Sequence, residues 1–185
     1  MSNPLSEIRN IRIGKATAMR EQGLQPYPSR SRRTHYSKAV IDGFEAMNGQ
    51  EVTVAGRLMS WRKQGGLAFG HIQDQSGRIQ LFLRKQAVKP IDKEAGTIGF
   101  AEFNLIDLGD IVEATGKVMK TERGEISVAV ETFRILTKTL RPKDSRACST
   151  WSTCFSRRIT SIGTTGAETS RSLRSQTTIY TRTGS

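Results

Sequence analysis

Residues 67–84 have the sequence LAFGHIQDQSGRIQLFLR, and this stretch decides the fold. Two segments, residues 67–73 and 78–84, flank Asp74-Gln75-Ser76-Gly77, which is typical of a turn. Successive residues of a strand point to opposite faces, so each segment has an inner and an outer set of side chains. The small and aliphatic set is expected to fill the interior: Ala68, Gly70, Ile72, Ile79, Leu81 and Leu83.

The outer face of this hairpin carries aromatic, cationic and hydrogen-bonding side chains. Its members are Leu67, Phe69, His71, Gln80, Phe82 and Arg84. A nucleobase stacks on a phenyl ring, which contributes about 1–3 kcal/mol, and its edge bonds to an amide or a guanidinium. The pattern therefore predicts a surface for single-stranded nucleic acid. A packing role for Phe69 or Phe82, and an ordinary polar surface role for His71, are the alternatives.

Three more strands are predicted around the hairpin. Val52, Val54 and Leu58 alternate in a first strand, with a bend or bulge at Gly56. The last two strands are expected at residues 110–119 and 126–136, and residues 86–106 suit a short helix with flanking loops. This order predicts a mainly β protein, a five-stranded OB-fold barrel over residues 51–142. An SH3-like barrel is the competing fold.

Residues 1–50 form an N-terminal helix and a connector. Apolar residues at helical spacing predict a helix over 5–22, with Gly23 after its end and Pro26 beyond. Its cations, Arg9, Arg12, Lys15 and Arg20, suit either a phosphate backbone or a solvated helix face. The connector carries Arg30, Arg32 and Arg33, and residues 39–47 are expected to form a short helix.

The overall charge favours a polyanionic partner. The net charge is +12 and the isoelectric point is about 10.3, and each cation that meets a phosphate releases a counterion. No apolar run is long enough to span a bilayer and no secretory leader is evident, so we expect no membrane partner and a cytoplasmic location. Cys148 and Cys154 have no histidine nearby, so no metal site is predicted.

The composition changes sharply near residue 144. Residues 145–185 contain 9 Ser, 10 Thr and 6 Arg but no Lys, and show no apolar period. Such a segment buries too little apolar surface to offset chain entropy. We expect residues 143–185 to be a disordered tail, and we interpret the tail as the product of a frameshift, which the gene's nucleotide sequence would test.

Several segments resemble the N-terminal anticodon-binding domain of class II lysyl-tRNA synthetases. The match runs from Ile8 to Pro142. It includes Val54-Ala55-Gly56-Arg57, Ile72-Gln73-Asp74, Gly77-Arg78-Ile79-Gln80-Leu81, Leu108-Gly109-Asp110-Ile111-Val112, Gly124-Glu125-Ile126-Ser127 and Leu136-Thr137-Lys138-Thr139-Leu140-Arg141-Pro142. Aspartyl and asparaginyl enzymes share the barrel, and the segments at 124–127 and 136–138 favour the lysyl branch.

The resemblance implies a role for particular side chains. Phe69 is similar to the residue that stacks on an anticodon uridine, and Gln80 and Arg62 to the groups that recognise the edge of that base. Glu125 is similar to the acceptor of a uridine N–H. The implied partner is the anticodon loop of lysine tRNA, and Phe82 and Arg84 complete the expected RNA-binding set. A general single-stranded nucleic-acid-binding protein is the alternative function.

The resemblance does not extend to catalysis. Full-length family members are homodimeric lysine–tRNA ligases that use ATP and Mg²⁺ in a separate catalytic domain. Nothing after Pro142 resembles that domain, and the first 144 residues contain no phosphate-binding loop, zinc-protease motif or nucleophile elbow. We therefore expect no catalytic residues and no cofactor in this chain, and no ATP–pyrophosphate exchange from this polypeptide.

Overall fold

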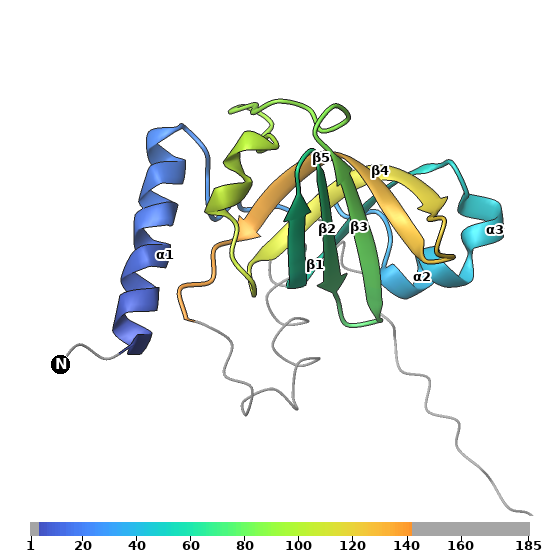
Figure 1. The fold of residues 1–185 in the computed structure, drawn as a ribbon, viewed down its shortest axis with the longest axis horizontal. Coiled ribbons are helices and arrows are strands. Elements are labelled where there is room, and N and C mark those ends of the chain that lie inside the picture. Colours follow the sequence, from blue (N-terminus) through green and yellow to red (C-terminus); the bar gives the residue numbers. More distant parts are fainter. Residues whose placement is uncertain (1–3, 142–185) are drawn as a thin grey trace, which may run out of the picture.

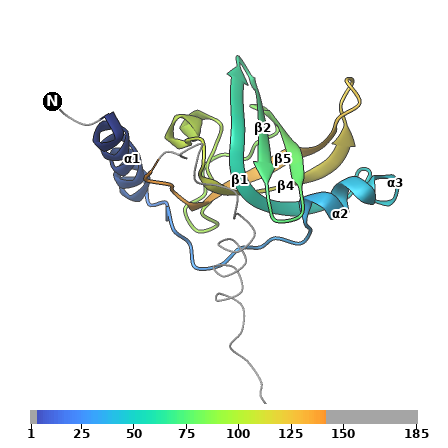
Figure 2. The same cartoon turned by 90° about the horizontal axis from the view of Figure 1, so that it is seen from below.

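The computed structural model describes residues 4–141 and shows a closed five-stranded barrel beside an N-terminal helix (Figures 1 and 2). The strands are β1 (Glu51–Gln64), β2 (Leu67–Gln73), β3 (Arg78–Arg84), β4 (Ile111–Lys120) and β5 (Ile126–Thr137). They close in the order β1-β2-β3-β5-β4, with β3 and β5 parallel and all other neighbours antiparallel. The predicted mainly β OB-fold with a preceding helix is confirmed.

Alternation along β2 and β3 places the predicted apolar set inside the barrel. Its members Ala68, Ile72, Ile79, Leu81 and Leu83 are all buried. Gly70 is the sixth member, and a Cβ atom there would come within 2.7 Å of the Trp61 ring. A side chain at position 70 would therefore displace the indole of Trp61, which enters this end of the barrel.

One local prediction on the barrel was wrong, and another is confirmed. Gly56 lies in regular register opposite Val112, and the irregularity of β1 falls between Leu58 and Ser60. Gly56 is required for another reason: a Cβ atom there would lie 2.7 Å from the carbonyl oxygen of Gln73. The prediction for residues 86–106 is confirmed, because they form one short helix, the 3₁₀ segment η1 (Ala101–Leu105), with flanking loops.

The helices lie outside the barrel wall. α1 (Pro4–Glu21) stands on one side, and the short α2 (Ser37–Asp42) and α3 (Phe44–Met47) stand on the other (Figures 1 and 2). α1 ends where Gly23, at φ 78°, donates to Arg20 and Leu24 donates to Met19, which is a Schellman motif. The predicted helix over 39–47 is two helices. The predicted tail lies outside the described residues.

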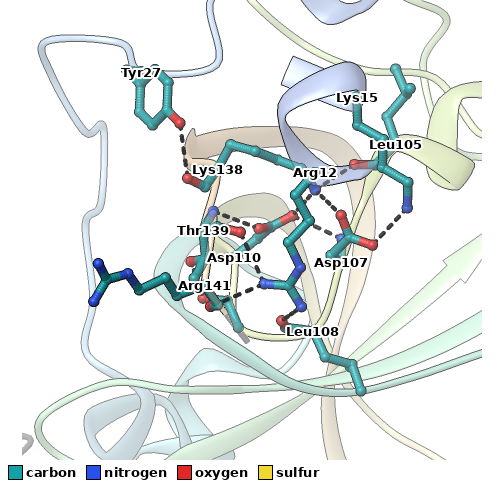
Figure 3. A network of polar contacts seen from close by, with 11 residues as sticks. Arg12, Lys15, Tyr27, Leu105, Asp107, Leu108, Asp110, Lys138, Thr139 and Arg141 are labelled. Atoms are coloured by element: carbon teal, nitrogen blue, oxygen red, sulfur yellow. Dashed lines mark hydrogen bonds and ion pairs between the residues drawn. The ribbon is translucent and has the colours of Figure 1, made fainter. Parts of the chain in front are cut away.

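A buried polar network joins α1 to the end of the barrel (Figure 3). The Arg12 guanidinium donates to the carbonyl oxygens of Thr139 and Leu108, at 2.9 and 3.1 Å. Lys15 donates to Asp107 at 2.6 Å. Arg12 is buried, so the two expectations for it, a phosphate contact or a solvated helix face, were both wrong. These two side chains attach α1 to the barrel.

Lys138 lies at the centre of the network. Its ammonium donates to the Leu105 carbonyl at 2.7 Å, to Asp107 at 2.5 Å and to Asp110 at 2.7 Å. Burial alone would raise the pKa of the Asp107 carboxyl. Hydrogen bonds from Lys138 and Lys15, together with their positive charge, outweigh it and lower that pKa below its ordinary value.

Candidate nucleic-acid interface

The predicted binding residues lie in rows across the outer wall of β1, β2 and β3. In the first row Arg62 is paired with Phe69, and Phe69 with Phe82. In the second row Ser60 is paired with His71, His71 with Gln80, and Gln80 with Ser127 of β5. Residues separated by two positions share a face of a strand, so the two rows are adjacent on one surface.

The first row forms an aromatic platform. The rings of Phe69 and Phe82 are 5.1 Å apart at their centroids and tilted by 35°. Phe69 is partly exposed, whereas Phe82 is only 9% exposed, because the Phe69 ring and the Arg84 guanidinium, 4.9 Å from its centroid, cover it. Phe69 is thus the accessible ring, and Phe82 supports it from the side.

Arg62 extends from the first row into solvent. It is exposed, and its neighbour Trp61 turns the opposite way, toward the rings of Phe103 at 5.2 Å and Phe133 at 5.9 Å. The inward position of Trp61 leaves the guanidinium of Arg62 as the cation beside Phe69. Arg84, at the far end of β3, is also exposed.

The second row is a chain of hydrogen bonds that ends on Glu125. The turn between β4 and β5 carries Glu125, and its two carboxylate oxygens bond to His71 Nε2 at 2.9 Å and to Gln80 Nε2 at 2.5 Å. Ser127 Oγ donates to Gln80 Oε1 at 2.7 Å. Because the amide oxygen of Gln80 faces Ser127, its NH₂ group must face Glu125, and Gln80 itself is largely buried, at 9% exposed.

The structure therefore brings all six predicted residues to one side of the barrel. Arg62, Phe69, Gln80, Phe82, Arg84 and Glu125 come from β1, β2, β3 and the β4–β5 turn. The sequence assigned His71 no role beyond an ordinary polar surface, although it bonds to both Ser60 Oγ and Glu125. The alternation of β2 already placed His71 outward, next to Phe69, but only the register of β1 shows that Ser60 is its neighbour.

A hollow lies on another side of the barrel, against β4 and β5. Its volume is about 750 Å³, and its lining combines cations such as Arg32, Lys89 and Arg134 with the carboxylates Asp92 and Glu113. Arg134 donates to Glu113 at 2.7 Å through Nη1, while its buried Nε has no hydrogen-bond partner among the described residues. Among residues 4–141 the lining includes no aromatic residue, so this part of the chain supplies the hollow with no ring on which a base could stack.

Within residues 4–141, no three side chains of the His, Cys, Asp and Glu types are grouped so that they could hold a metal ion. No helix in the same range is long and apolar enough to cross a bilayer. The two cysteines lie outside the described residues.

Comparison with known proteins shows what the barrel is similar to. Residues 52–136 match the tRNA anticodon family model, which describes an OB-fold nucleic acid binding domain. The barrel is similar to this family, and the match covers 85 of the chain's 185 residues. Its matched range runs from the second residue of β1 to the penultimate residue of β5, so it includes both rows and the Glu125 turn.

Curated relatives extend the similarity beyond the barrel. Lysine–tRNA ligase of Carboxydothermus hydrogenoformans is 40% identical over 138 residues, 75% of this chain and 27% of that protein. The Thermosynechococcus vestitus enzyme is 44% identical over 144 residues, and the Bacillus subtilis enzyme 38% over 145. These two matches cover 74% and 75% of this chain, and 28% of each relative. The resemblance to lysyl-tRNA synthetases is confirmed, and the chain spans about a quarter of the length of these relatives.

Proposed function

We propose that the outer wall of β1–β3 binds an unpaired uridine in the anticodon loop of a tRNA. The observation that carries this proposal is the position of the partly exposed Phe69 ring beside the Gln80–Glu125 pair. Gln80 is diagonal to Phe69 across the β2–β3 pair, and such positions are about 7–8 Å apart. One base stacked on the ring can reach that pair with its Watson–Crick edge.

The Gln80–Glu125 pair has hydrogen-bonding capacity left for a base. The Gln80 NH₂ group uses one hydrogen for Glu125 and keeps a second, and each Glu125 oxygen accepts one bond but has lone pairs for two. A donor beside an acceptor complements uracil, which offers the O4 acceptor beside the N3–H donor. Cytosine offers a donor and an acceptor in the reverse order, so it faces the pair with like groups.

Charge supports an RNA partner in addition to the base contacts. Arg62 and Arg84 are exposed at the two ends of this surface, and the whole chain carries a net charge of +12. Exposed guanidinium groups bind phosphates or base edges, and phosphate contacts make affinity fall with salt. Affinity for RNA is therefore expected to decrease steeply with ionic strength.

The finer identity of the partner is also proposed. The relatives are named lysine–tRNA ligases, and from that name we infer a lysine tRNA, whose anticodon is rich in uridine. We assign no cofactor to the barrel, and we propose ATP, Mg²⁺ and a homodimeric state only for the full-length relatives. A cytoplasmic location remains a prediction.

A filter-binding experiment at fixed salt tests the proposal. The probes are an RNA stem-loop with UUU in its loop, the same stem-loop with CCC, and an unstructured oligonucleotide. We expect the intact chain to prefer the UUU loop, and Phe69→Ala to weaken that binding. Tyr36→Ala, which removes a partly exposed ring outside this wall, is the matched control. Equal affinity for all three probes would favour the alternative, a general single-stranded nucleic-acid-binding protein.

A further inference from the structure

We propose that His71 is a positioning residue that holds Glu125 in the orientation needed to distinguish uracil from cytosine. This inference rests on the proposed function, because it concerns the same surface. It assigns a role to His71, which the proposed function leaves without one, and to Ser60, which hydrogen-bonds to the His71 ring. Four polar contacts at one end of the hairpin carry the argument.

His71 donates to Glu125 in either of its common protonation states. Its Nδ1 is 2.8 Å from Ser60 Oγ, and its Nε2 is 2.9 Å from Glu125 Oε1. An ionised carboxylate only accepts hydrogen bonds, so Nε2 must carry a hydrogen. Ser60 can donate to Nδ1 of a neutral ring or accept from Nδ1 of a charged one, and both arrangements keep Nε2–H directed at Glu125.

The position of Ser60 depends on the irregularity in β1. The register shifts between Leu58 and Ser60, and this shift places Ser60 directly opposite His71. A bulge of this kind re-aims the side chains that follow it along a strand. The ring of His71 is thereby held on one nitrogen by the barrel wall and presents the other nitrogen to the β4–β5 turn.

Glu125 needs such a restraint. Its side chain is 48% exposed, and the turn that carries it has Gly124 at φ 85°. His71 is less exposed, at 23%, and lies between Glu125 and the wall of the barrel. Without the His71 bond, Glu125 would keep one restraint, from Gln80, and its carboxylate could turn away from the position of a base stacked on Phe69.

The predicted consequence is a loss of discrimination. A held carboxylate accepts from uracil N3–H and repels the N3 lone pair of cytosine, whereas a mobile one can turn away from either base. His71→Ala should therefore lower affinity for a uracil loop more than affinity for a cytosine loop. The ratio of the two affinities should fall about 10-fold, which is within the range of one well-placed polar contact.

Filter binding with two stem-loops that differ at a single loop base, U or C, tests this inference. His71→Ala should reduce the ratio, and His71→Gln, whose amide can still donate to Glu125, should recover most of it. In a Glu125→Ala background, His71→Ala should change the ratio by less than about 2-fold, since a positioning residue acts only through its partner. Melting curves establish that each variant is folded, and Ser60→Ala, a milder change, should reduce the ratio less than His71→Ala.

The outcomes separate this inference from the function on which it rests. A wild-type ratio near 1 would overturn the proposed function, and this inference with it. A wild-type preference for uracil that survives His71→Ala would overturn the role of His71 alone. Equal losses from His71→Ala in both backgrounds would also overturn it, because His71 would then act on the RNA without Glu125.

Discussion

Two polar networks in this molecule use the same chemistry in opposite surroundings. In the network around Lys138, two carboxylates accept from an ammonium whose side chain is fully buried, and Asp110 is fully buried as well. In the network around Glu125, one carboxylate accepts from an imidazole and an amide while it remains half exposed. Burial decides which network fixes the structure and which can bind a ligand.

The counts of donors and acceptors make the same distinction. The three hydrogens of the Lys138 ammonium meet three acceptors, so that group has no capacity for a ligand. Glu125, which is half exposed, keeps spare lone pairs, and the largely buried Gln80 keeps a spare hydrogen beside it. We expect the saturated network to contribute to stability and the unsaturated network to contribute to the proposed recognition of a base.

The largest expected effect comes from Lys138→Met. The change leaves Asp110 without an ammonium and Asp107 with Lys15 alone, and an uncompensated buried charge costs about 3–5 kcal/mol. Urea denaturation should show a loss of that size in the free energy of unfolding. Lys117→Met is the matched control, because Lys117 is exposed on β4. A loss below about 1 kcal/mol, the value of an exposed pair, would contradict the assignment of this network to stability.

Phe69→Ala should weaken binding more than stability, the reverse of what we expect for Lys138→Met. The ring lies on the outer wall and is partly exposed, so its removal leaves the barrel core intact. Binding to the UUU stem-loop should weaken by about 1–3 kcal/mol, the value of stacking on one base. The unfolding free energy, measured on the same sample, should change by less than the binding free energy. If stability fell and affinity did not, Phe69 would be a packing residue.

The strands and their faces could be predicted from sequence because their information is local. The turn residues 74–77 and the alternation on either side fix β2 and β3 to the residue. The same alternation identified Phe69, Gln80 and Phe82 as outward-facing. Nothing beyond neighbouring side chains and the period of a strand is needed for these conclusions.

The two networks could not be predicted, because each joins residues that are distant in the chain. Arg12 contacts Thr139, 127 positions away, and a cation on a helix gives no indication of such a partner. His71 contacts Ser60 only because β1 changes register between Leu58 and Ser60. Register and long-range closure depend on the whole barrel, so the sequence showed which residues face outward but not which of them bond to each other.

Asp107→Asn tests the buried network with a smaller change and with pH. At pH 7 it should destabilise the chain by about 1–2 kcal/mol, since two charged donors lose an anionic acceptor. The pKa of Asp107 is below its ordinary value of 3.8 in the folded chain, so its contribution is present above that value and disappears as pH falls through the folded pKa. Urea midpoints of the variant and the wild type should therefore converge below about pH 4. A constant difference from pH 7 to pH 3 would show that the charge of Asp107 does not contribute.

The smallest expected effect distinguishes Arg62 from Arg84, two exposed arginines on the outer wall of β1–β3. Arg84 lies over Phe82 at the end of β3, where a phosphate contact is expected, and Arg62 lies beside Phe69, where a base edge is expected. Arg84→Gln should weaken binding to every loop alike and reduce the slope of log affinity against log salt by about 0.7. Arg62→Gln should leave that slope nearly unchanged and reduce the preference for UUU over CCC. Titrations at four salt concentrations measure the salt slope and the preference for UUU over CCC. If Arg62→Gln reduced the slope and Arg84→Gln reduced the preference, Arg62 would be the phosphate contact.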